Sequence, residues 1–319
     1  MRVLITGTGF IGSYSAAELL NRGDEVVSYG FYEDITSMSN VINLNKIVQV
    51  KGDVLDFKSL KDAVVNNSVE AIVHTAAILI AGARENPLNA VKVNVLGTAN
   101  VLEISRLTGV KKVIYTSSGN VYTMLNPYVE YTPSPDGLVK EDDHTFPGSV
   151  YGTTKLSSEY LGLNYHHLYG IDFISLRLPT VYGGWLGKMG LAGVIRDMCK
   201  AALTDEAIEV EEYKSEWLHV KDAAYAIALA LHVKDTNSKI YNIGTGEINS
   251  LAELHSLLKE ATKKTLTNIK IKEVPRPIRY PSDISRAKTE LGFVPKYDFK
   301  TGVLDVFDWV KRYLINKVA

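Results

Sequence analysis

Tyr151 and Lys155 are the residues of this chain whose types and spacing most directly suggest chemistry. On a helix, side chains four positions apart share a face, so the Lys155 ammonium would lie beside the Tyr151 phenol. A cation there favours the phenolate and lowers the tyrosine pKa from its usual value near ~10, giving an acid/base usable near neutral pH. The spacing alone is weak, because Tyr313 and Lys317 repeat it, so its meaning depends on the surrounding elements.

A nucleotide-binding element begins the chain. Residues 2–6 have the branched apolar composition of a buried strand, and a Gly-x-Gly-x-x-Gly turn at 7–12 leads directly into a helix. Glycines let the backbone approach a pyrophosphate, and the helix N-terminus offers free N–H groups and a positive dipole end. Strand, turn and helix in this order predict dinucleotide binding by Gly7, Gly9, Phe10, Ile11 and Gly12.

Strands and helices continue to alternate along the first 180 residues. Strands are predicted at 25–29, 47–50, 71–74, 112–116 and 173–178, and helices at 57–65, 87–107 and 149–169. This order implies an α/β fold with a Rossmann-type, doubly wound parallel sheet. Later helices are predicted at 192–203, 221–232, 251–262 and 301–315, with short strands near 240 and 269. We therefore expect a Rossmann domain over 1–180 and a smaller α/β, mainly substrate-binding lobe over 181–319 that partly returns to it.

Composition excludes several classes of protein. The 319 residues are 46% hydrophobic and 22% charged, as in ordinary globular enzymes, and the net charge of −1 argues against a general nucleic-acid binder. Cys199 is the single cysteine, so neither an internal disulfide nor a Cys-based zinc cluster is expected, and we predict no metal. No secretory signal and no membrane-length apolar run is found, which favours a cytoplasmic protein.

Short motifs fall in order along nearly the whole chain, at residues 6–12, 52–56, 74–77, 94–100, 115–118, 151–155, 177–183, 217–222, 241–246 and 290–293. Together they resemble the extended short-chain dehydrogenase/reductase family, of the NAD-dependent epimerase/dehydratase type. The resemblance implies that Tyr151 exchanges a proton with a substrate hydroxyl or carbonyl. Lys155 would lower the pKa of Tyr151 and bind the nicotinamide ribose, and Ser118, with Ser117 as an alternative, would hydrogen-bond the reacting oxygen.

The resemblance also implies contacts along the rest of the cofactor. Asp53 and Val54 would flank the adenine, and Ala76 and Ala77 would lie against the adenine-side ribose and the phosphates. Asn94 would hold the Ser118 strand in place, and the remaining contacts would come from Thr116, Pro179 and Val181, the last two beside the nicotinamide.

Two departures from the family pattern concern the cofactor. The glycine turn is one residue shorter than the family's Gly-x-x-Gly-x-x-Gly. Gly30 stands where an acid usually receives the adenosine ribose hydroxyls, with Glu33 and Asp34 a little beyond it and no Arg or Lys following to meet a 2′-phosphate. This favours NAD and leaves NADP possible.

A third departure concerns the substrate. Nucleotide-sugar members of the family typically carry Asn in place of Thr180 and an Arg near Ser215. Arg276 and Arg279 remain as possible anion clamps. Other substrate contacts are expected from the Ser118–Gly119 turn, from Leu79 and Arg84, and from a glycine-rich stretch at 183–188 that could act as a flexible cover. A sugar nucleotide is therefore one candidate, and a free sugar, sugar acid or hydroxy acid is its rival.

The turn that follows Ser118 limits the types of reaction to be considered. Dehydratases and decarboxylating members of the family carry a carboxylate there, whereas residues 119–122 read Gly-Asn-Val-Tyr. The resemblance therefore favours an epimerase-like enzyme, with a net dehydrogenase or reductase as the alternative and a non-catalytic cofactor sensor as a third reading. It also implies a homodimer formed through the helices at 87–107 and 149–169.

Overall fold

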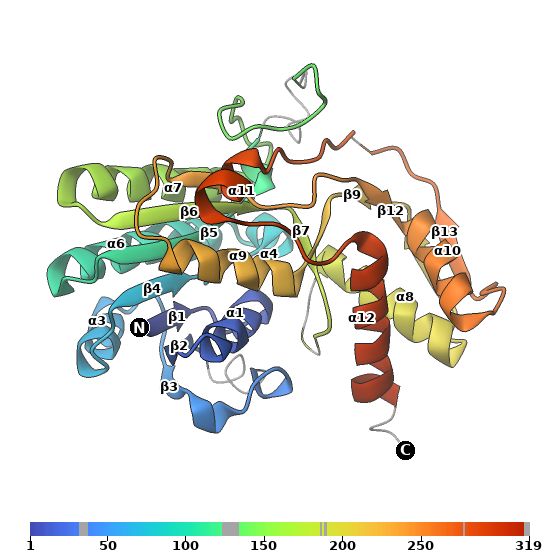
Figure 1. Ribbon diagram of the computed structural model, residues 1–319, viewed down its shortest axis with the longest axis horizontal. Coiled ribbons are helices and arrows are strands. Elements are labelled where there is room, and N and C mark those ends of the chain that lie inside the picture. The colour runs from blue at the N-terminus through green and yellow to red at the C-terminus, as the bar shows by residue number, and fades with distance from the viewer. Residues whose placement is uncertain (32–37, 123–133, 186, 188–189, 277, 316–319) are drawn as a thin grey trace.

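A computed structural model describes residues 1–31, 38–122, 134–185, 187, 190–276 and 278–315. Its centre is a parallel sheet of seven strands in the order β11-β6-β5-β4-β1-β2-β3 (Figure 1). The strands are β1 (Arg2–Thr6), β2 (Glu25–Gly30), β3 (Val48–Lys51), β4 (Ala71–His74), β5 (Lys112–Ser118), β6 (Asp172–Leu178) and β11 (Ile240–Asn242). The predicted Rossmann-type doubly wound fold is confirmed.

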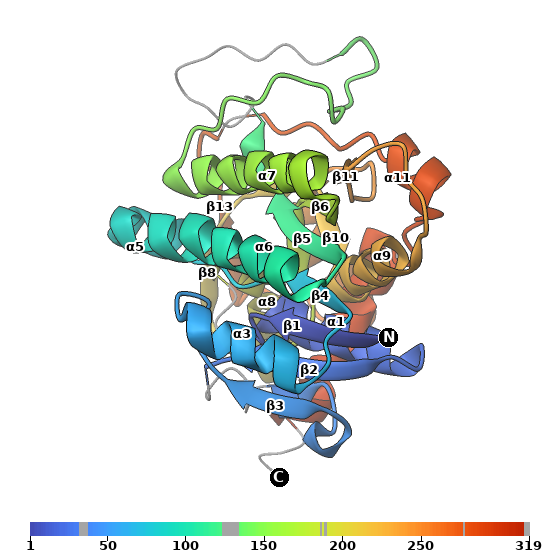
Figure 2. The same ribbon diagram turned by 90° about the vertical axis from the view of Figure 1, so that its left-hand side faces the viewer.

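Helices cover both faces of this sheet because successive strand residues point to opposite sides. One face carries α3 (Phe57–Asn66), α6 (Gly97–Thr108) and α7 (Val150–Tyr169), which lie in front of the sheet in Figure 2. The other face carries α1 (Phe10–Asn21) and α9 (Val220–His232). Within β1, Val3 and Ile5 join the core under α1 and α9, whereas Leu4 joins the core under α3 and α6.

The helix predicted at 87–107 contains a wider turn. The structure divides this stretch into α5 (Pro87–Val91), a π-helical turn η3 (Lys92–Leu96) and α6, with the short helix α4 (Ile80–Glu85) before them. Within this π turn the Asn94 carbonyl accepts the hydroxyls of Thr98 and Ser158 at 2.6 and 2.9 Å. The turn therefore ties α6 to α7.

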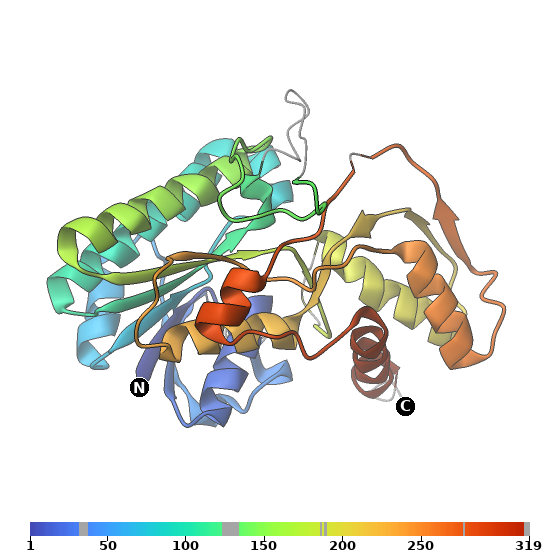
Figure 3. The same cartoon turned by 45° about the horizontal axis from the view of Figure 1, so that its top comes forward.

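A second core lies beside the sheet (Figure 3). It is built by α8 (Gly193–Thr204), α10 (Leu251–Thr262) and α12 (Phe299–Val310), which ends in a π turn, η7 (Lys311–Ile315). Pairs of short strands accompany it: β7 (Thr180–Tyr182) with β10 (Trp217–His219), β9 (Lys214–Ser215) with β12 (Asn249–Ser250), and β8 (Ile208–Glu211) with β13 (Ile269–Lys272). The chain passes from β6 straight into β7, so this group adjoins the carboxyl end of the sheet.

The remaining elements are short. They are the 3₁₀ turns η1 (Met38–Asn40), η2 (Leu44–Lys46), η4 (Gly119–Val121) and η6 (Gly190–Ala192), and the helix α11 (Ser285–Leu291). In the described part of the chain, no helix is both long and apolar enough to cross a membrane.

Candidate active site

The glycine turn between β1 and α1 is shaped by close backbone contacts. Gly7 has a φ of +78°, and a Cβ on it would lie 2.4 Å from the Ala76 backbone nitrogen. A Cβ on Gly12 would lie 2.0 Å from the Gly7 carbonyl oxygen. The Thr75 hydroxyl supports the turn, 2.8 and 2.6 Å from the carbonyl oxygens of Thr6 and Gly7. Thr75 was not recognised from the sequence.

The start of α1 fits a pyrophosphate. Among the described residues no side chain caps this helix at Gly9, so the backbone N–H groups of Phe10, Ile11 and Gly12 have no partner within the helix. A Cβ built on Gly9 would meet no atom within 4 Å, which places open space directly at these donors. Free N–H groups at a helix N-terminus bind anions, so the predicted phosphate site is geometrically sound.

The predicted adenine-side residues lie next to this turn. Ala76 packs directly against Gly7. The Asp53 carbonyl accepts the Tyr29 hydroxyl at 3.0 Å, and the Val54 carbonyl accepts the Asn100 amide at 2.8 Å. Asp53, Val54 and Ala76 lie at the carboxyl edge of the sheet, as contacts with the adenosine part of the cofactor require. These contacts, and the predicted contact of Ala77, stay predictions. Glu33 and Asp34 lie outside the described residues.

Ser118, Tyr151 and Lys155 converge where β5 meets α7. Ser149 caps α7 by accepting the Gly152 N–H at 3.1 Å, which starts the helix directly before Tyr151. Tyr151 is 8% exposed and hydrogen-bonds Ser118. The Lys155 ammonium donates to the Thr116 carbonyl at 2.7 Å and lies 5.7 Å from the centre of the Tyr151 ring. The three predicted catalytic side chains therefore form one cluster.

Burial controls the electrostatics of this cluster. It raises the pKa of Tyr151 to about 12, against a lowering effect of the Ser118 hydrogen bond. It lowers the pKa of Lys155 to about 7, while the Glu159 carboxylate one turn away raises it. The expectation that Lys155 brings the pKa of Tyr151 below its usual value is therefore not met by the protein groups alone, because desolvation of the phenolate outweighs them.

Ser118 is arranged as a hydrogen-bond donor. Its oxygen accepts from the backbone N–H of Asn120 at 3.2 Å and from the Asn120 side-chain amide at 3.0 Å. The hydroxyl hydrogen is thereby left to point elsewhere, and Tyr151 is its neighbour. Ser117, the alternative considered from the sequence, is buried and makes no hydrogen bond within the described structure. The geometry favours Ser118.

Asn94 and Thr116 position other groups. Asn94 bonds both backbone groups of Ile78 and the Thr154 hydroxyl, and it is 1% exposed. It therefore holds the chain after β4 against α7, the helix that carries Tyr151 and Lys155, and its predicted role at the cofactor stays a prediction. Thr116 bonds the His74 carbonyl through its hydroxyl and Lys155 through its own carbonyl.

The two histidines of the short motifs, His74 and His219, are packed residues. His74 bonds the hydroxyls of Thr6 and Thr98 through its two ring nitrogens. Burial and the Lys155 charge lower its pKa to about 3, so it is neutral. His219 is buried and stacks on Tyr297. Within the described residues, no group of three or more His, Cys, Asp or Glu side chains could hold a metal ion.

A buried ion pair stands behind the cluster. Arg177 on β6 contacts Glu159 on α7 at 2.8 Å, and the two side chains are 3% and 1% exposed. Arg177 also donates to the Tyr122 hydroxyl, which in turn donates to Asn242 on β11. The sequence does not reveal this pair, because its two members lie on different elements. The network fixes α7, and with it Lys155, against the sheet.

Two pairs of residues on the predicted substrate side make contacts that the sequence did not indicate. Thr180 and Ser215, the two departures from the family pattern, hydrogen-bond each other at 2.8 Å. Arg276 forms an ion pair with Glu211, whereas Arg279 makes no ion pair within the described structure. Both guanidinium groups lie over the Tyr213 ring, 5.2 and 4.9 Å from its centre. Arg279 is therefore the better placed of the two to receive an anion.

The remaining substrate-side predictions fall on exposed or anchored segments. Leu79 and Arg84 are exposed, at the start and near the end of α4. The described part of the glycine-rich stretch is anchored rather than free: the Tyr14 hydroxyl donates to the Gly184 carbonyl at 2.7 Å, and Trp185 is buried against Phe10. Packing of the aromatic side chains holds the stretch in place, which its glycine content alone did not indicate. Leu186 and Lys188 lie outside the described residues.

A family model described as "NAD dependent epimerase/dehydratase family" matches residues 3–244, well over half of the chain. The chain belongs to this family. A putative UDP-glucose 4-epimerase of Methanocaldococcus jannaschii is 32% identical, over 97% of this chain and 98% of its own length. These matches confirm the resemblance found in the motifs, and they identify the protein as an enzyme of the extended short-chain dehydrogenase/reductase type.

Solved structures agree. The UDP-glucose 4-epimerase of Thermotoga maritima with UDP-glucose superposes with a TM-score of 0.84 at 27% identity, covering 98% of this chain and 100% of that one. The UDP-glucose 4-epimerase of Thermus thermophilus in complex with NAD superposes with a TM-score of 0.81 at 27% identity and the same coverage. The free N–H groups and open space at the start of α1 are therefore the features of this chain that fit NAD.

Proposed function

We propose that the protein is an NAD-dependent epimerase acting on a sugar nucleotide, through transient removal and return of a hydride. The observation that carries the proposal is the convergence of Ser118, Tyr151 and Lys155 at the carboxyl end of β5, the same edge of the parallel sheet at which the glycine turn follows β1. The relatives named as UDP-glucose 4-epimerases support the nucleotide-sugar class and make UDP-hexoses the first candidates.

In the proposed reaction one substrate oxygen lies between Ser118 and Tyr151. Tyr151 accepts the hydroxyl proton as the carbon loses its hydride, and Ser118 donates a hydrogen bond to the developing carbonyl. Lys155, held by the Thr116 carbonyl, stabilises the phenolate when it is protonated. NAD, when bound, supplies the hydride-accepting nicotinamide and a positive charge that also favours the phenolate. The ketone then turns its other face towards the nicotinamide. The proton returns from Tyr151 to the oxygen as the hydride returns to the same carbon.

The turn after Ser118 supports epimerisation over elimination. Gly119, Asn120, Val121 and Tyr122 carry no carboxylate, so this turn offers no base that could remove a proton from the carbon beside the ketone. Asn120 instead binds Ser118. The ketone formed in the site would therefore be reduced again rather than lose a group.

The test uses a panel of UDP-, GDP- and dTDP-sugars, with epimers followed by NMR. We expect turnover with at least one sugar nucleotide and its loss in Tyr151→Phe, while Tyr313→Phe, which removes the hydroxyl of the other Tyr-x-x-x-Lys pair, stays active. Absence of binding and turnover across the panel would overturn the assignment.

A second candidate is net oxidation or reduction of a smaller alcohol, sugar acid or hydroxy acid. The specific observation in its favour is the Thr180–Ser215 hydrogen bond, which occupies positions where larger Asn and Arg groups would meet a nucleotide. It predicts that added NAD is reduced stoichiometrically by such an alcohol, which NADH absorbance measures. Epimer formation without accumulation of NADH would exclude it.

We also propose that the protein is a homodimer formed through α5, α6 and α7, which lie side by side (Figure 2). Exposed apolar side chains support this face: Leu88 on α5, Leu96 at the end of η3 and Tyr160 on α7. Light scattering should give a dimer mass that Tyr160→Asp reduces to a monomer. Val65→Asp, an exposed site on α3, is the matched control, and an unchanged mass in Tyr160→Asp would contradict this face.

A cytoplasmic location is proposed from composition. The single cysteine, Cys199, is buried and free, as is usual in a reducing compartment. Fractionation of the native cells, with detection by antibody, would test this, and recovery outside the cytoplasm would contradict it.

A further inference from the structure

The adenosine end of the cofactor site has an unusual pair of residues, Thr8 and Gly30. Gly30 ends β2, where enzymes of this fold usually place an acid that binds the ribose hydroxyls. A Cβ built on Gly30 would lie 2.7 Å from the Thr8 hydroxyl oxygen, too close for an unperturbed contact. Thr8 therefore occupies the space in which a side chain at position 30 would begin.

The Thr8 hydroxyl has no hydrogen-bond partner among the described residues, although it is buried. Buried polar atoms are normally hydrogen-bonded, so an unpaired hydroxyl at this position points to a bound partner such as a ligand. With a hydroxyl in place of a carboxylate, position 30 itself carries no negative charge; the acids nearest to it in sequence after β2, Glu33 and Asp34, lie outside the described residues.

β3 places a lysine beside this position. Gly30 and Lys51 are Cα partners in the β2–β3 register, and the Gly52 N–H donates to the Gly30 carbonyl at 3.0 Å. Lys51 is exposed and forms no ion pair with any described residue. A cation thus stands next to the place where the family acid is missing.

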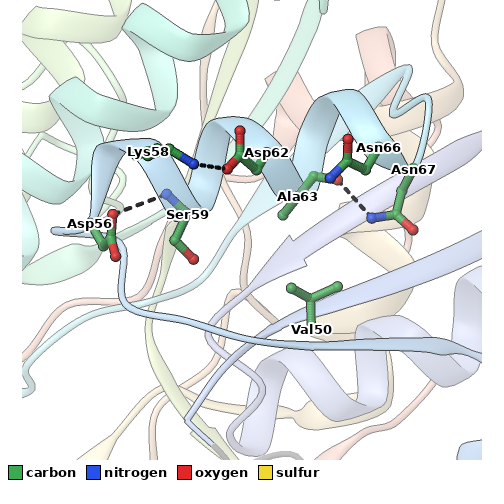
Figure 4. A pocket seen from close by; sticks show the side chains of 8 residues that line it. All are labelled: Val50, Asp56, Lys58, Ser59, Asp62, Ala63, Asn66 and Asn67. Carbon is green, nitrogen blue, oxygen red and sulfur yellow. Dashed lines mark hydrogen bonds and ion pairs between the residues drawn. The ribbon is translucent and has the colours of Figure 1, made fainter.

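Strand alternation puts Lys51 on the same face as the missing side chain of Gly30. Tyr29 points to the α3 face, since its hydroxyl bonds the Asp53 carbonyl and Ser59. Its register partner Val50 also points there, into a groove of about 420 Å³ beneath α3 (Figure 4). Gly30 and Lys51 each follow by one residue, so both face the opposite side, towards Thr8. The charges lining the groove are already engaged there: Lys58 and Asp62 pair with each other, and Asp56 accepts the Ser59 N–H at the start of α3.

We propose that this end of the site accepts a 2′-phosphate on the adenosine ribose, with Lys51 as its cationic partner, so that the chain binds NADP as well as NAD. A carboxylate at position 30 would repel a 2′-phosphate; here it is replaced by a neutral hydroxyl, and a cation lies alongside. The inference rests on the cofactor-binding part of the proposed function. Sequence reasoning missed Lys51 because it considered only the residues directly after β2, and Lys51 lies at the end of the next strand.

The test measures the dissociation constants of NAD and NADP by calorimetry, without any turnover. For the wild-type protein we expect the two affinities to agree within about tenfold, and only NADP binding to weaken strongly with salt. Lys51→Ala should weaken NADP binding by about fivefold, the size of one exposed charge pair, and leave NAD binding within about twofold. Lys51→Glu should weaken NADP further. Lys61→Ala is the matched control and should change neither constant, because Lys61 is an exposed lysine on α3 with no ion pair to any described residue.

A second pair of variants tests the steric part. Thr8→Ala with Gly30→Asp provides both the carboxylate and the room for it, and should weaken NADP binding by more than about tenfold relative to NAD. Gly30→Asp alone should bind both nucleotides worse than the double variant, because its Cβ meets Thr8.

The outcomes separate this inference from the proposed function. Wild-type preference for NAD by more than about a hundredfold, or equal loss of both nucleotides in Lys51→Ala, would overturn the Lys51 assignment and leave the proposed epimerase intact. If neither nucleotide binds the wild-type protein, the dinucleotide site itself is wrong and both proposals fail.

Discussion

Replacing Glu159 by Gln should destabilise the protein strongly and shift its pH profile. The carboxylate contacts Arg177 at 2.8 and 3.1 Å and accepts the Ser175 hydroxyl at 3.0 Å, with almost no solvent access. Glu159→Gln leaves the Arg177 charge buried with only neutral partners, which costs about 3–5 kcal/mol. Chemical denaturation followed by circular dichroism measures this loss.

The same change acts on Lys155. Glu159 raises the pKa of Lys155, against the lowering effect of burial, so its removal lowers that pKa further. If protonated Lys155 stabilises the Tyr151 phenolate, the fall of turnover on the alkaline side should move to lower pH in Glu159→Gln. The pH dependence of turnover for the wild-type and variant proteins measures the shift.

Two controls separate stability from electrostatics. Glu159→Gln with Arg177→Met removes both charges and should recover much of the lost stability, yet keep the shifted pH profile, because the shift comes from the carboxylate. Asp62→Asn breaks the exposed pair with Lys58 and should cost less than about 1 kcal/mol. A Glu159→Gln protein as stable as Asp62→Asn, or one with the wild-type pH profile, would refute this reasoning.

Three further predictions concern the site itself. Tyr151→Phe should reduce turnover by about 10²–10⁴-fold with nearly unchanged NAD affinity; undiminished turnover would remove Tyr151 as the acid/base. Gly9→Ala should fold normally but lose NAD binding, because its Cβ enters the open space at the start of α1. Gly12→Ala should lose NAD binding and also lower the melting temperature, because its Cβ would lie 2.0 Å from the Gly7 carbonyl oxygen. Equal melting temperatures for the two variants would contradict this. Because the pKa of Lys155 is about 7 when folded and about 10.5 when unfolded, the unfolded state binds more protons between these values, so stability should rise with pH across that window, and Lys155→Met should flatten the rise.

The sequence was sufficient for features that depend on neighbouring residues. The glycine turn, its strand and its helix are contiguous, so spacing alone indicates a dinucleotide site. Tyr151 and Lys155 lie on one helix, and the capping residue Ser149 stands directly before it. The parallel sheet follows from the alternation of strands and helices, which needs no knowledge of contacts.

Other features depend on contacts between distant residues. Thr180 and Ser215 were noted separately as departures, but only the structure pairs them. Arg177 and Glu159, like Gly30 and Lys51, belong to different elements. The pKa of Tyr151 was misjudged because it depends on burial, which a charge four residues away does not reveal.

The path of the hydride tests the central claim most directly. A UDP-hexose deuterated at the carbon that is inverted should be incubated with the protein and NAD, and the epimer examined by NMR. Transient hydride transfer beside Tyr151 predicts that the epimer keeps its deuterium on that same carbon, in ordinary water and without net formation of NADH. An epimer that has lost the deuterium to solvent would contradict the proposed mechanism.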